Sequence, residues 1–147
     1  MKTMSEQALV TNLLRSPLRF PWRTQAEILH KTEVRVTSNR VDVVYYEKKN
    51  EFDVGFIAAV EVKLHDWRKA LQQAHRNKLF ADRVYVALPA EFSSSAMINL
   101  AEFRRASIGL IIIDGSGAKI HFHPPLNKHR SNRHVIKVKQ TLCSTSH

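Results

Sequence analysis

The sequence predicts one α/β domain whose sheet contains strands of mixed direction, an α+β mixed sheet. Two observations predict this class. Runs of β-branched and aromatic residues alternate with segments whose apolar residues follow helical spacing. In addition, 147 residues with 44% hydrophobic character supply one core but not comfortably two. The chain has only four glycines, so we expect densely spaced regular elements joined by short turns.

Local signals place the individual elements. Ser5 and Asp66 are residue types that cap helices, and each precedes an amphipathic stretch. The dipeptide Ser38-Asn39 separates two strand-like runs and predicts a hairpin turn. In order along the chain, the expected elements are a helix over 6–15, strands over 33–36, 41–46 and 56–63, a helix over 67–79, a strand over 83–88, a helix from Ser93 or Ser94 to Ala106, and strands over 108–113 and 119–122.

The charge balance is strongly basic. Lys and Arg number 23 against 13 Asp and Glu, a formal net charge of +10, which indicates a polyanionic partner and nucleic acid first. No acid follows Asp114, whereas six Lys and Arg do. We therefore divide the chain into a domain over 1–123 and a basic C-terminal tail over 124–147. The tail is either solvated and partly frayed or a basic arm that lies along phosphates.

Cysteine content and hydropathy indicate the cellular compartment of the protein. Cys143 is the only cysteine, so no intramolecular disulfide can form, which fits a reducing environment. No apolar run approaches the roughly 20 residues that span a bilayer, and no secretory signal pattern precedes the first helix. We expect a cytoplasmic protein with no membrane partner.

Charged residues inside two of the predicted strands indicate a candidate metal-binding and catalytic site. Asp42 interrupts one strand, and Glu61-Val62-Lys63 ends another, where alternation places Glu61 and Lys63 on one face. An ion pair at a strand end explains Glu-x-Lys taken alone. If the two strands are neighbours, Asp42 and Glu61 can instead bind a divalent cation through hard oxygens, with the carbonyl of Val62 as a further ligand. Lys63 would then position or deprotonate the attacking water and offset phosphate charge.

These residues give the sequence a resemblance to the PD-(D/E)XK nuclease superfamily, which includes restriction endonucleases, archaeal Holliday junction resolvases and RecB-type nuclease domains. Arg40-Val41-Asp42 is similar to the first half of the family motif, and Glu61-Val62-Lys63 to the second. The element order over residues 5–90 is also similar. The resemblance implies a restriction endonuclease-like αβββαβ core, here with an added helix and strands.

The resemblance further implies roles for five residues. Asp42 and Glu61 would bind the metal, and Lys63 would be the catalytic lysine. Glu6 would be the supporting carboxylate from the first helix, and Gln73 the catalytic-site glutamine that some branches carry on the helix after the lysine. Magnesium is the expected ion, with manganese as a substitute, because carboxylate, carbonyl and water ligands suit a hard cation.

Two positions depart from the family pattern. Val41 replaces the proline of the family name, which removes little chemistry. Asn77 stands where RecB-type members carry tyrosine, which weakens a close RecB relationship.

Two other groups of residues are candidates for a functional site. The four histidines at 121, 123, 129 and 134 match no common zinc spacing. Glu33 begins a strand and is either an exposed edge charge or a residue near the site.

The expected function is therefore a metal-dependent DNA endonuclease that acts in repair, recombination or restriction. Two alternatives stay open: a nuclease-like module that binds nucleic acid without cutting it, and a nuclease directed at RNA. Family analogy also suggests a homodimer that cuts both strands. Phosphate contacts need only positive charge, so the residues expected to bind nucleic acid are Arg40, Arg68, Lys69, Arg76, Lys128, Arg130 and Arg133.

Overall fold

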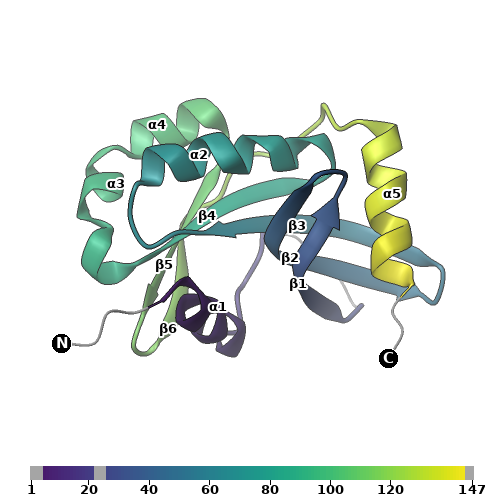
Figure 1. The fold of residues 1–147 in the computed structure, drawn as a ribbon, viewed down its shortest axis with the longest axis horizontal. Coiled ribbons are helices and arrows are strands. Elements are labelled where there is room, and N and C mark those ends of the chain that lie inside the picture. Colours follow the sequence, from purple (N-terminus) through teal and green to yellow (C-terminus); the bar gives the residue numbers. More distant parts are fainter. Residues whose placement is uncertain (1–4, 22–25, 145–147) are drawn as a thin grey trace.

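A six-stranded mixed sheet forms the centre of the computed structural model, which describes residues 5–21 and 26–144. The strands lie side by side in chain order (Figure 1). The first three form an antiparallel meander, the third to fifth run parallel, and the last returns antiparallel. The mixed sheet predicted from the sequence is thus confirmed. The strands are β1 (Ile28–Val36), β2 (Asn39–Asn50), β3 (Asp53–Val62), β4 (Arg83–Pro89), β5 (Gly109–Asp114) and β6 (Gly117–Phe122).

Five α-helices cover the two faces of the sheet. Helix α1 lies on one face, and the other four lie on the opposite face (Figure 1). The crossovers between parallel strands run through α2 and then through α3 and α4. The helices are α1 (Glu6–Arg15), α2 (Trp67–His75), α3 (Ser94–Ile98), α4 (Leu100–Ala106) and α5 (Asn132–Cys143), with short 3-10 turns η1 (Arg76–Leu79) and η2 (Ala90–Phe92).

The capping residues act as the sequence indicates. The Ser5 hydroxyl accepts the backbone N–H of Ala8 at 3.1 Å, and the Asp66 carboxylate accepts that of Lys69 at 3.3 Å. Both bonds satisfy amide groups that the first turn of a helix leaves unpaired. The predicted helix 67–79 becomes α2 followed directly by η1, and the predicted helix to Ala106 is divided at Asn99 into α3 and α4.

Each face of the sheet has its own apolar core. On the α1 face, Leu9 and Leu13 are fully buried against side chains of the central strands, such as Val60. On the opposite face, Trp67 stacks on Phe103 with ring centroids 5.6 Å apart. Apolar burial on both sides holds the central strands rigidly, which is the support that a site at their ends requires.

The C-terminal segment departs from the sequence prediction. Residues 132–143 form α5, and Ser131 caps this helix by accepting the N–H of His134. Val138 and Leu142 are fully buried in the core beside α2. The expectation of a solvated tail or free arm is therefore wrong for this part, because two apolar residues at helical spacing gain more by burial than by exposure. Among the described residues, no helix has the length and apolar character to cross a membrane.

Candidate active site

Asp42 lies where the pairing of β2 with both of its neighbours is interrupted. The backbone pairing of β2 with β3 begins at Val43 and Val60. One residue earlier on β2, the Asp42 carboxylate accepts a hydrogen bond from the N–H of Val62 at 2.8 Å in place of a backbone carbonyl. On the other side, the β1–β2 ladder skips the step between Glu33 and Asp42, and Glu33 has a positive φ of 51°. The local opening frees the Asp42 side chain from the regular sheet.

Glu61 is the neighbour of Asp42 on β3 and is 7% exposed. Its Oε1 accepts a hydrogen bond from Asn77 Nδ2 at 3.0 Å. Burial raises the pKa of Glu61 to about 8, and the nearby Asp42 carboxylate adds to this rise, whereas the Asn77 hydrogen bond and the charge of Arg76 oppose it. The structure therefore brings the two acids together, as the sequence predicts, and favours a proton between them at neutral pH.

An acidic cavity of about 460 Å³ lies beside Asp42 on the α1 face of the sheet, and Glu61 does not line it. Glu6 from α1, Glu33 from β1 and Asp42 from β2 line it together with Val62, and no lysine or arginine does. The structure thus places Glu6 beside Asp42, and it adds Glu33, which the sequence analysis left undecided. In a protein of net charge +10, three carboxylates around one cavity give it a cation-attracting potential.

Neither Lys63 nor Gln73 lines the acidic cavity. The Lys63 backbone N–H donates to the Ala87 carbonyl at 3.0 Å, and the Lys63 side chain is half-buried. Gln73 is half-buried on α2, one turn before Asn77. The amide that contacts Glu61 belongs to Asn77, so the expectation that Gln73 is the amide of the site is not met by the geometry. The sequence did contain a signal for this contact. Asn77 continues the helical spacing of the apolar residues Trp67, Ala70 and Ala74, which predicts that it is buried.

The donor set fits a hard divalent cation. Magnesium is commonly held by one or two carboxylates, with water and substrate phosphates as the other ligands. Asp42 and Glu61 each use one oxygen in the bonds to Val62 and Asn77, and the carbonyl of Val62 lies on the same strand end. Within residues 5–21 and 26–144, no group of three or more His, Cys, Asp or Glu side chains converges on one point. Asp42 and Glu61 are the two carboxylates that would hold such an ion.

Four of the predicted nucleic-acid contacts have partners within the chain. The exposed Arg76 guanidinium donates to Asn39 Oδ1 at 2.8 Å. Arg40 pairs with Glu33 at 3.6 Å, with both side chains exposed. The Arg68 guanidinium lies 4.2 Å from the centroid of the Trp67 ring. These three side chains remain at the surface, where phosphates can reach them.

Arg130 differs because its ion pair with Asp82, at 3.1 Å, is half-buried. The Asp82 carboxylate also accepts the N–H of Ile57 at 2.8 Å, so this pair ties the segment before α5 to the sheet. Arg130 is thus committed to the fold, contrary to the prediction of a phosphate contact. Lys69, Lys128 and Arg133 are exposed.

No protein-family model matches the chain, and no curated protein is similar to it. Among solved structures, the SPO1766 protein of unknown function from Silicibacter pomeroyi has a similar fold, with a TM-score of 0.57 and 23% sequence identity. The match covers 78% of this chain and 70% of that one. This likeness shows a shared fold.

Proposed function

We propose that this protein is a metal-dependent nuclease that hydrolyses phosphodiester bonds in nucleic acid, with DNA as the expected substrate. The observation that carries the proposal is the adjacency of Asp42 and Glu61 at the point where β2 and β3 stop pairing. Lys63 follows two residues after Glu61 on the same strand end. Two carboxylates can hold a divalent cation, and a lysine can offset charge on a phosphate.

The topology supports the same proposal. Helix α1 on one face, the antiparallel meander of β1 to β3, helix α2 on the other face and the parallel strand β4 follow the αβββαβ order of the PD-(D/E)XK superfamily. We therefore propose a restriction endonuclease-like core over residues 5–90, to which α3, α4, β5, β6 and α5 are additions. The net charge of +10 suits a polyanionic substrate.

Each side chain has a defined part in the proposed chemistry. Asp42 and Glu61 would hold Mg²⁺ or Mn²⁺, with the Val62 carbonyl as a further ligand. When bound, the ion supplies positive charge at the phosphate and lowers the pKa of bound water. The Lys63 ammonium offsets charge that develops on the phosphate. Asn77 acts on Glu61 as a positioning residue, because its hydrogen bond fixes one carboxylate oxygen.

The test is a cleavage assay on supercoiled, linear, single-stranded and branched DNA and on RNA, with Mg²⁺, Mn²⁺ or EDTA. We expect metal-dependent cutting that falls at least about 100-fold in Asp42→Asn and Lys63→Met. Glu102→Gln is the matched control, because Glu102 is a surface residue of α4 paired with Arg105. Cutting that persists in both site variants, or in EDTA, would overturn the proposal.

A second candidate function is binding without cleavage. It is favoured by the burial of Glu61 and by the position of Lys63 outside the acidic cavity, since both features restrict access to the reacting groups. This function predicts that nucleic acid binds with equal affinity to wild type and Asp42→Asn and is never cut. The same substrate panel, read by gel shift and by cleavage, separates the two functions.

A further inference from the structure

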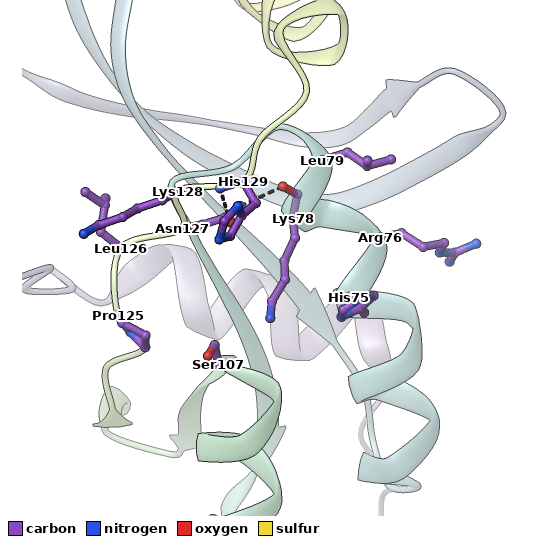
Figure 2. Close-up of a pocket in the computed structure, with 10 residues that line it drawn as sticks. All are labelled: His75, Arg76, Lys78, Leu79, Ser107, Pro125, Leu126, Asn127, Lys128 and His129. Carbon is purple, nitrogen blue, oxygen red and sulfur yellow. Dashed lines mark hydrogen bonds between the residues drawn. The ribbon is translucent and has the colours of Figure 1, made fainter.

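A second cavity, of about 640 Å³, lies on the outer side of η1, between the end of α4 and the segment that leads into α5. Figure 2 shows its lining. Five of its ten lining residues carry positively charged or titratable side chains, and no acid takes part. They are His75, Arg76, Lys78, Lys128 and His129. The volume is within the 300–1,000 Å³ that is typical of sites for small ligands or single ligand groups.

Apolar side chains lie among these cations. Leu79 and Leu126 are 45% and 46% exposed, and Pro125 lies beside them in the lining. In Figure 2, Arg76 and Lys128 extend outward on opposite sides of the cavity. The cavity therefore combines a cationic rim with exposed apolar surface and two imidazole rings.

The wall is held in place by the fold. Asn127 Nδ2 donates to the carbonyl oxygens of Lys78 at 2.7 Å and Ala81 at 3.0 Å, and the Asn127 backbone N–H donates to Asp82. The Ser131 N–H donates to the Leu79 carbonyl at 2.8 Å, and the half-buried Arg130–Asp82 pair anchors the same segment. A wall bonded in this way is preorganised, so a ligand would not bear the cost of ordering it.

The cavity lies across η1 from Glu61. Arg76 of η1 lines it. The next residue, Asn77, turns inward and contacts Glu61 directly. A ligand in the cavity would therefore lie on the outer side of the same 3-10 turn whose inner side contacts Glu61.

We propose that this cavity binds an unpaired nucleotide of a single-stranded nucleic acid segment of the substrate. A blunt duplex presents phosphates outward and keeps its bases stacked inside, so it would leave the apolar surface unused. An unpaired base offers a flat face to imidazole and apolar side chains, and its phosphates meet the cationic rim. This inference rests on the proposed nuclease function and narrows its substrate to strands with an unpaired segment.

The test measures binding in EDTA, where no cleavage takes place. Fluorescence anisotropy compares a single-stranded DNA oligonucleotide, the same sequence as RNA, a blunt duplex, and that duplex with a single-stranded overhang. We expect wild type to bind the single-stranded and overhang probes at least about fivefold more tightly than the blunt duplex. The DNA and RNA arms identify which single strand the cavity prefers.

The decisive variants are Lys128→Glu and Leu126→Glu, with Lys119→Glu on β6 as the matched control. All three replaced residues are exposed, and Lys119 lies outside the cavity. We expect each cavity variant to lose at least three times more single-strand affinity than the control. An equal loss in the control, or no preference for unpaired strands in wild type, overturns the inference. Failure of the nuclease proposal is seen separately, as absence of metal-dependent cutting by wild type.

Discussion

Asn77 donates a hydrogen bond from its side-chain amide to Glu61 Oε1 at 3.0 Å, across the interface between η1 and β3. Both side chains are buried, with exposed fractions of 4% and 7%. A buried amide and a buried carboxyl group are retained in an apolar core only when they satisfy each other. This bond therefore fixes the orientation of the acid on which the proposed metal site depends.

Replacing Asn77 tests that dependence. In Asn77→Leu, the pKa of Glu61 should rise further, because the hydrogen bond that lowers it is lost. A metal must then displace a more firmly held proton, so we expect the Mg²⁺ concentration for half-maximal cleavage to increase about tenfold. Gln72→Leu, at an exposed position on the preceding helix α2, is the control and should leave the requirement unchanged. An unaltered Mg²⁺ requirement in Asn77→Leu would contradict the positioning role.

The raised pKa of Glu61 also predicts how stability depends on pH. The folded value of about 8 exceeds the ordinary value of 4.5, so the native state binds more protons than the unfolded state between these two values. The contribution of Glu61 to stability is complete below pH 4.5 and is lost as pH rises toward 8. In EDTA, we expect the free energy of unfolding of wild type, relative to Glu61→Gln, to fall across this window by a few kcal/mol at most. Urea unfolding at several pH values measures this difference.

Added Mg²⁺ gives the matching control for the pH prediction. If Asp42 and Glu61 bind the ion, Mg²⁺ should restore stability at pH 8 in wild type and have little effect in Glu61→Gln. A flat difference between wild type and variant in EDTA would mean that Glu61 is ionised in the folded protein at neutral pH.

Several local signals in the sequence were sufficient to predict structure. Ser5 and Asp66 cap the helices expected of them. The first two strands form the expected hairpin, but its turn is Thr37-Ser38, because Asn39 already pairs with Val36 as the first residue of β2. The adjacency of Asp42 and Glu61 was also predictable, because consecutive strands of a hairpin lie side by side. These features depend on local chemistry or on neighbouring elements of the chain.

The features that the sequence did not reveal depend on contacts between distant elements. Val135, Val138 and Leu142 follow Ser131 at helical spacing, but the surrounding lysines obscure this pattern in the sequence. The helix is stabilised by burial of these apolar side chains against the sheet, a contact between distant parts of the chain. Similarly, nothing local distinguishes Arg130 from the exposed Arg133. The difference comes from Asp82, which lies 48 residues earlier in the chain.

Arg130 provides a test of this difference. Its side chain is 30% exposed and that of Asp82 13%, between the regimes of exposed and fully buried pairs. We expect Arg130→Ala to lower the free energy of unfolding by about 1–2 kcal/mol, and Arg133→Ala to change it by less than about 0.5 kcal/mol. Urea unfolding of the two variants measures both values. Equal effects would show that the Arg130–Asp82 pair does not anchor this segment.

The last prediction concerns whether α5 belongs to the folded domain. Leu142 is fully buried against the sheet, whereas Ile136 on the same helix is 57% exposed. Truncation of a buried leucine removes its transfer free energy and leaves a cavity, so Leu142→Ala should destabilise the protein by about 2–4 kcal/mol. Ile136→Ala should cost less than about 0.5 kcal/mol, because its side chain is mostly in water in both states. If both variants melted like wild type, α5 would be a frayed appendage. A large effect at Leu142 alone would instead show that the basic C-terminal segment is part of the core.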